Sequence, residues 1–218
     1  MGYKVKLGVD ENGKDFYLDF DKTTNIILRG TTGGGKSICL HTIIKRILEH
    51  DKSAKFILFD SKTIEFSRYK GIENINVVSS WKVEDVLPIL NNLYEEENNL
   101  KNDVFVIFDE LSDYYFFRHR SLDKPLLKLI ENNKNKKVHL LISSQMYYGP
   151  KKISPKIPDR LGFCGCNLAD SLSMIGKGGC EHLHGRGDCK DKIDGNLTHF
   201  QVDWIWNEIK EYINSLKK

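Results

Sequence analysis

The residues with the clearest chemical pattern lie between Gly30 and Ser37, in the stretch GTTGGGKS. This stretch fits the phosphate-binding pattern G-x-x-x-x-G-K-[ST], and it stands between an apolar run and a helix-like segment, as the pattern requires. Its glycines let backbone N–H groups surround phosphate oxygens, while the lysine contacts the β- and γ-phosphates and the hydroxyl can ligate Mg²⁺. We therefore expect a site for ATP and Mg²⁺ made by Gly30, Thr31, Thr32, Gly33, Gly34, Gly35, Lys36 and Ser37.

Two acids, Asp109 and Glu110, follow the apolar run VFVIF. We expect Asp109 to hold the magnesium shell together with Ser37, and Glu110 to orient and polarise the attacking water. An apolar strand that ends in two acids is common by itself, but beside a phosphate-binding loop it predicts hydrolysis. Gln145 ends a further apolar run, where its amide could sense the γ-phosphate; plain surface polarity explains it equally well.

These groups need a scaffold of strands and helices. Apolar, β-branched runs predict strands in residues 25–30, 55–60, 104–110, 137–145, 160–166 and 197–204. Residues 36–50 repeat their apolar positions with helical spacing, and residues 204–218 are typical of a terminal amphipathic helix. Continuous apolar strands that alternate with helices favour a mostly parallel sheet covered on both faces. The expected fold is a three-layer α/β structure in a single domain, 1–218.

Composition sets further bounds. Hydrophobic residues make up 40% and charged residues 29%, which is ordinary for a globular protein. No leader and no apolar stretch of membrane-spanning length is visible, so the sequence predicts a cytoplasmic protein. The five cysteines favour free thiols. Cys164, Cys166, Cys180 and Cys189 near His182 and His184 could be metal ligands, but their spacing is a weak zinc signal.

The chain resembles the motor domain of the FtsK/SpoIIIE family of DNA translocases over nearly its whole length. The matching segments, in order, are LGVDENGKDFYLDF, GTTGGGKS, FDSKTIEFSRYKGI, FDELSD, SSQ, KIPDRLGF and GKGGCEHLHGRGD. The resemblance implies a RecA-like P-loop fold, a homo-hexameric ring around double-stranded DNA, and ATP hydrolysis between subunits. The sequence starts and stops close to the motor core, so the expected protein is a bare motor without the family's membrane segments or DNA-orienting module.

One departure concerns an arginine. Where the family has Asp-Ser-Arg, this chain has Asp170-Ser171-Leu172, which removes a charge that could reach a neighbour's nucleotide. Arg160, at the entry to a strand, or Arg186, in a glycine-flanked turn that we expect to be mobile, would have to supply it in trans. For Arg160, a structural ion pair is an equally good interpretation.

The expected DNA contacts follow from the resemblance. The family's pore loops fall after the acid pair and after Gln145, here in a region rich in lysine and arginine between Arg118 and Arg160. A solvated helix face and a nucleic-acid surface both explain such a run. The phosphate contacts we expect are Arg118, Arg120, Lys151 and Lys152.

Three functions are compatible with these residues. The first is an ATP-driven translocase of double-stranded DNA, for transfer or segregation of a plasmid, integrative element or phage genome. The second is a viral genome-packaging ATPase, which would need a portal partner. The third is a nucleotide-switched binding module with little turnover, which Leu172 favours and Glu110 opposes. The sequence identifies no membrane, relaxase or portal partner.

Overall fold

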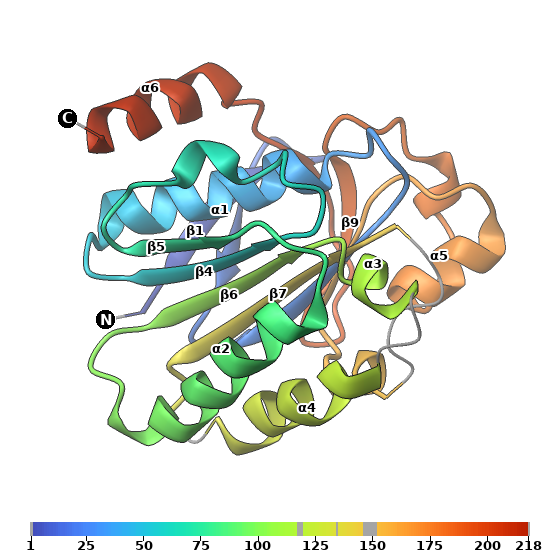
Figure 1. Cartoon of the computed structure of the whole chain (residues 1–218). Helices are drawn as coiled ribbons and strands as arrows, with labels where there is room; N and C mark the ends of the chain where they lie inside the picture. The colour runs from blue at the N-terminus through green and yellow to red at the C-terminus, as the bar shows by residue number, and fades with distance from the viewer. Residues whose placement is uncertain (1, 117–119, 134, 146–151, 218) are drawn as a thin grey trace.

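The computed structural model describes residues 2–116, 120–133, 135–145 and 152–217. In these ranges the chain forms a ten-stranded sheet in the order β2-β1-β10-β9-β8-β3-β7-β6-β4-β5 (Figure 1). Six neighbouring strands are parallel: β8 (Arg160–Gly162), β3 (Asn25–Arg29), β7 (Val138–Ser144), β6 (Val104–Asp109), β4 (Lys55–Asp60) and β5 (Ile75–Val78). The remaining four pair antiparallel: β1 (Lys4–Asp10), β2 (Asp15–Asp19), β9 (Asp188–Lys192) and β10 (His199–Val202).

Helices cover both faces of this sheet, as Figure 1 shows. One face carries α1 (Lys36–His50) and α6 (Trp206–Leu216). The other carries α2 (Val83–Glu96), α3 (Leu111–Phe116) and α4 (Asp123–Asn132), while α5 (Leu168–Ile175) packs near β8. Short 3₁₀ turns occupy Ser67–Tyr69, Glu97–Asn99, Arg120–Leu122, Ser154–Lys156 and Cys180–His182. The predicted three-layer α/β fold is confirmed.

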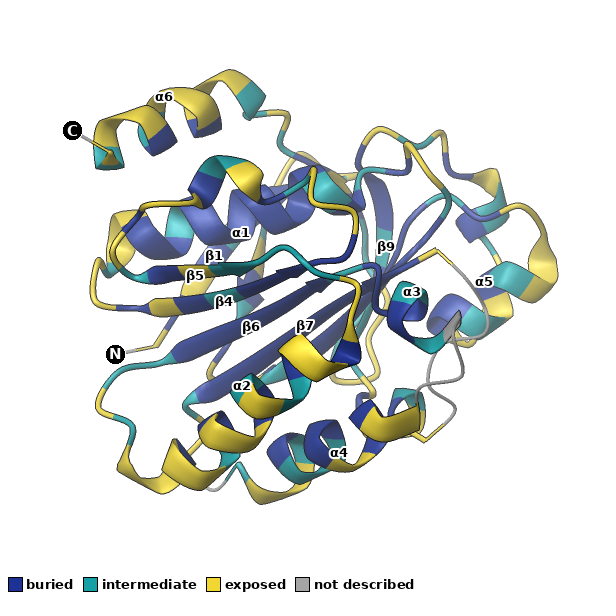
Figure 2. Ribbon diagram, viewed as in Figure 1, coloured by how far each residue is buried: buried dark blue, intermediate teal, exposed yellow. Residues whose placement is uncertain are grey.

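The two faces explain why the central strands are continuously apolar. On β6, Phe105 and Ile107 belong to the core under α1, whereas Val106 and Phe108 belong to the core under α2 and α4. Successive side chains of a strand point to opposite faces, so a doubly covered strand has no polar face. Figure 2 shows buried central strands and helices that are exposed only on their outer side.

The carboxyl ends of four parallel strands lie side by side at one end of the sheet. β3, β7, β6 and β4 are neighbours, so the residues that follow their carboxyl ends meet there. Asp60 and Asp109 are even partners in the β4–β6 register. Ligands of open α/β sheets bind beyond the carboxyl ends of the strands, which directs attention to this end.

Candidate nucleotide site

The glycine-rich loop lies between β3 and α1, where the sequence predicted it. Its backbone has left-handed or similar positive φ values at Gly33 (76°) and Gly35 (113°), which favour glycine. α1 begins at Lys36 with Gly35 as its N-cap, so free N–H groups of the first helical turn face the loop. This arrangement has the geometry of a phosphate cradle.

Lys36 is buried against the loop that it serves. Its Nζ donates hydrogen bonds to the carbonyls of Gly30 (2.7 Å) and Thr31 (3.0 Å). Burial lowers the pKa of Lys36, while the negative charges of Glu110 and Asp109 oppose that shift. A partly desolvated cation held by two carbonyls is well placed to exchange these bonds for phosphate oxygens.

A second segment supports the loop from the antiparallel side of the sheet. The N–H groups of Arg186 and Gly187 donate to the carbonyls of Gly33 (3.0 Å) and Gly34 (2.8 Å). A Cβ on Gly35 would come within 2.3 Å of the Gly187 nitrogen, so the two segments touch. The glycine-flanked turn around Arg186 is therefore fixed to the P-loop of its own domain, which corrects the expectation that it is mobile.

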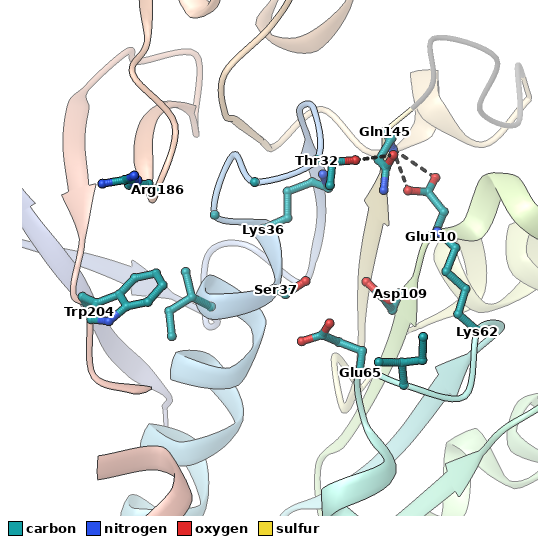
Figure 3. Close-up of a pocket in the computed structure, with 14 residues that line it drawn as sticks. Thr32, Lys36, Ser37, Lys62, Glu65, Asp109, Glu110, Gln145, Arg186 and Trp204 are labelled. Atoms are coloured by element: carbon teal, nitrogen blue, oxygen red, sulfur yellow. Dashed lines mark hydrogen bonds between the residues drawn. The ribbon is translucent and has the colours of Figure 1, made fainter. Parts of the chain in front are cut away.

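The acid pair ends β6 beside this loop. Glu110 is buried and has a left-handed φ of 63°. Its carboxylate accepts hydrogen bonds from the Gln145 backbone N–H, at 3.0 Å to each oxygen, and from the Ser112 hydroxyl. The side chain of Gln145 in turn accepts a hydrogen bond from the Thr32 hydroxyl (3.0 Å). Gln145 thus joins the P-loop to Glu110, as Figure 3 shows.

Asp109 points into the space between β6 and the start of α1 (Figure 3). Burial raises its pKa to about 7, and the nearby carboxylates of Glu65, Asp60 and Glu110 contribute further. Among the described residues no three His, Cys, Asp or Glu side chains could hold a metal by themselves. Mg²⁺, however, commonly uses one or two protein ligands together with phosphates and waters. The oxygen donors and excess negative charge around Asp109 fit such an ion.

Sequence reasoning assigned no role to Glu65, which the structure brings into the site. Glu65 follows β4, and its carboxylate meets His41 Nε2 at 2.7 Å. That hydrogen bond lowers the pKa of Glu65, and a contact with Ser37 adds to the effect. His41 is held by its other ring nitrogen, 2.8 Å from the Tyr69 hydroxyl. The segment FDSKTIEF carried the only signal, a family resemblance without a residue role.

The loop, the acid pair, Gln145 and Glu65 line one cavity of about 520 Å³, within the range of small-molecule sites. Thr32, Gly33, Gly35, Lys36, Ser37, Asp109, Glu110 and Gln145 line it, together with Lys62, Glu65, Arg186 and Trp204. Gly30, Thr31 and Gly34 complete the loop, and the Thr31 N–H donates to the Cys164 carbonyl (2.8 Å).

Arg160 is not one of the residues that line this cavity. Its guanidinium donates to three main-chain carbonyls of its own domain, those of Ser154 (2.9 Å), Ser173 (3.1 Å) and Met174 (3.5 Å). The guanidinium thus joins the end of α5 to the segment before β8, and it forms no ion pair with any residue that the structure describes. Leu172 is 50% exposed on α5.

The expected DNA contacts are only partly described. Arg118 and Lys151 lie outside the described residues, while Arg120 and Lys152 are exposed. Other members of the basic run are engaged: Lys156 pairs with Glu131 (2.7 Å), and the Lys128 ammonium lies 4.5 Å from the Tyr94 ring centroid. These two described members of the run therefore have partners within the domain.

Two further expectations concern thiols and membranes. All five cysteines are free, and those near His182 and His184 form no metal cluster within the described part of the chain. Over the same residues, no helix combines the length and the apolar character needed to cross a bilayer.

Comparison with known proteins agrees with this geometry. A sequence model of the FtsK/SpoIIIE family matches residues 1–102. DNA translocase FtsK of Caldanaerobacter subterraneus subsp. tengcongensis is 27% identical to this chain in an alignment 247 residues long. That alignment includes 98% of this chain. The first 102 residues of the chain are thus similar to the FtsK/SpoIIIE family. The chain spans 35% of the length of that FtsK relative.

Solved structures of ATPases show the same fold as this chain. The conjugation coupling protein TcpA of pCW3 has a TM-score of 0.76 and 18% identity, over 99% of this chain and 70% of its own. B204, the DNA-packaging ATPase of Sulfolobus turreted icosahedral virus, has a TM-score of 0.64 and 14% identity, over 83% of this chain and 98% of its own.

Proposed function

We propose that residues 1–218 form a single motor domain that binds ATP with Mg²⁺, hydrolyses the ATP, and moves double-stranded DNA as part of a homo-hexameric ring. The observation that carries this proposal is the bonded path from Thr32 through Gln145 to Glu110. These hydrogen bonds connect the phosphate-binding loop to the carboxylate that we propose activates water. A site that only binds nucleotide does not need such a connection.

The hydrogen bonds suggest how the chain's own residues act. Backbone N–H groups of the loop and the α1 N-terminus hold the phosphates, and Lys36 transfers from its two carbonyls to phosphate oxygens. A γ-phosphate near Thr32 competes with the Gln145 side-chain oxygen for the Thr32 hydroxyl, and the resulting shift of Gln145, whose backbone N–H holds Glu110, releases Glu110 toward the attacking water. Ser37 and Asp109 would hold Mg²⁺, which would neutralise phosphate charge.

The work that we propose for this cycle is transfer or segregation of a plasmid, integrative element or phage genome. The match of residues 1–102 to the FtsK/SpoIIIE family model and the likeness in fold to a conjugation coupling protein and a packaging ATPase support it. The exposed Leu172 favours the alternative of a nucleotide switch with little turnover, because no arginine stands there to stabilise transferring charge.

Steady-state ATP hydrolysis with and without long duplex DNA tests the proposal. A motor is stimulated strongly by DNA, and it displaces a third strand from a triplex as it moves. A switch shows slow turnover that DNA leaves unchanged. Tight ATP binding with no DNA stimulation and no triplex displacement would overturn the motor and favour the switch.

A further inference from the structure

The cavity continues beyond the phosphate-binding residues to a part with no assigned role. In Figure 3, Glu110 and Gln145 lie on one side, Lys36 and Ser37 in the middle, and Arg186 with Trp204 on the opposite side. This inference rests on the proposed function: if the γ-phosphate lies beside Glu110 and Gln145, the base of the nucleotide must lie toward Arg186 and Trp204.

Trp204 has the properties of a binding platform. Its side chain is 69% exposed although it lines the cavity, and an indole so open to water presents a large apolar face for a planar ligand. The backbone beneath it is fixed, since the Asp203 N–H donates to the Leu7 carbonyl (2.8 Å) and the Asp203 carboxylate pairs with Arg46 (2.7 Å). A rigid support lowers the entropy lost on binding.

Arg186 stands above this platform (Figure 3). Its backbone is held on both sides, by the N–H bond to Gly33 (3.0 Å) and by a bond from the Gln201 amide to its own carbonyl (2.9 Å). Its φ of 55° is unfavourable for a residue with a side chain. Such strain persists where the surrounding structure enforces it, typically at ligand sites.

We propose that Trp204 is the base platform of the nucleotide site, stacking on the nucleobase, and that Arg186 contacts the ribose-phosphate of the same nucleotide from within the same domain. Every nucleobase has an aromatic face, so stacking selects weakly among bases. The ligand class is therefore nucleoside triphosphates with little selection by base, with ATP and GTP bound to within a few-fold of each other.

Calorimetric titration of the 218-residue chain with ATP, GTP and inorganic tripolyphosphate tests this assignment. Trp204→Ala should weaken ATP and GTP binding about tenfold, since a base–aromatic stack contributes on this order, and should leave tripolyphosphate binding unchanged. Trp204→Phe should recover most of the loss. The matched control is Trp81→Ala, which removes a half-exposed indole that does not line the cavity.

A second readout does not depend on an alanine variant. In the Trp81→Phe/Trp206→Phe protein, the fluorescence of Trp204 should be quenched by ATP and not by tripolyphosphate. If Trp204→Ala binds ATP like the parent and ATP leaves the fluorescence unchanged, the assignment is overturned. Loss of ATP binding in Lys36→Ala would then show that the proposed function survives. If the parent binds neither ATP nor tripolyphosphate, both proposals fail together.

Discussion

We propose different chemical roles for Lys36 and Glu110, phosphate binding and activation of water. One is a buried cation held by carbonyls of the phosphate-binding loop, and the other is a buried carboxylate held by the backbone of a neighbouring strand. Because their partners differ, removal of each should affect nucleotide binding and turnover differently.

Lys36→Ala should abolish ATP binding and turnover, because the variant lacks the charge that we place on the β- and γ-phosphates. Thermal unfolding followed by circular dichroism should remain cooperative near the parental midpoint, since a desolvated ammonium contributes little net stability. Calorimetry and an ATPase assay measure the loss. Parental turnover in the folded variant would contradict the P-loop assignment.

Glu110→Gln should keep ATP affinity within a few-fold, because the amide fits the same space and Ser37 and Asp109 are untouched. Turnover should fall by ~100-fold or more, since the amide cannot accept a proton from water. Equilibrium binding and single-turnover hydrolysis separate the two quantities. An affinity that collapses with the rate would place Glu110 among the binding groups instead.

At the scale of elements, the sequence predicted the helices and strands whose positions depend on local apolar patterns. α1 occupies the predicted residues 36–50, and β4, β6 and β7 follow their apolar runs. β9, by contrast, reads DCKDK and carries no apolar pattern, yet it lies between β8 and β10. Its place is set by pairing with neighbours, which a local pattern cannot reveal. The motif residues of the site were predicted, whereas Glu65 and Trp204 reach it only through tertiary packing.

β9 also places an acid where burial disfavours its charge. Asp191 is 3% exposed, and burial raises its pKa to about 6, although Thr198 donates a backbone hydrogen bond to the carboxylate. The folded state therefore binds more protons than the unfolded state between the ordinary pKa of 3.8 and the raised value. The free energy of unfolding falls as pH rises through that interval.

Asp191→Asn removes this charge and retains an oxygen that can accept the Thr198 hydrogen bond. The variant should be more stable than the parent by about 1–3 kcal/mol at pH 8, and should differ little from it at pH 4. Urea unfolding at both pH values measures the difference, with the exposed Glu73→Gln as control. An equal difference at both pH values would contradict a role for Asp191 ionisation.

At the scale of the whole molecule, the basic run is the region where we propose that DNA binds. Among its described members, Lys156, Lys128 and Arg160 have partners within the domain, whereas Arg120 and Lys152, two of the expected phosphate contacts, are exposed. Arg120 lies on the segment after β6, and Lys152 lies on the segment after β7. Both strands end beside the candidate nucleotide site.

The double variant Arg120→Ala/Lys152→Ala should bind duplex DNA more weakly, with a salt dependence reduced by about two units, because each phosphate contact contributes about one. Sequence preference should not change. Fluorescence anisotropy at several salt concentrations gives the slope, and Lys14→Ala/Lys22→Ala, on the β1–β2 side, is the control. An unchanged slope would place the DNA contacts on other residues.

Arg186 allows a test of how subunits share a site. Since its turn is bonded to its own P-loop, Arg186→Ala should raise the KM for ATP, and mixing it with Lys36→Ala subunits should not restore the parental KM. An arginine acting in trans would be supplied by the Lys36→Ala neighbour, so recovery of KM in mixed assemblies would contradict a role within one subunit. ATPase titrations over a range of mixing ratios distinguish the outcomes.

The close contact between Gly35 and Gly187 limits how this sequence can diverge. A side chain at position 35 would collide with the backbone of the turn before it met any phosphate, and the φ of 113° would strain it even without the collision. In a library that randomises residue 35 alone, glycine should dominate the survivors. When residues 185–187 are randomised as well, glycine should still dominate at position 35, because changes in the turn can relieve the collision but not the φ. Two loops 152 residues apart in the chain therefore limit each other's divergence.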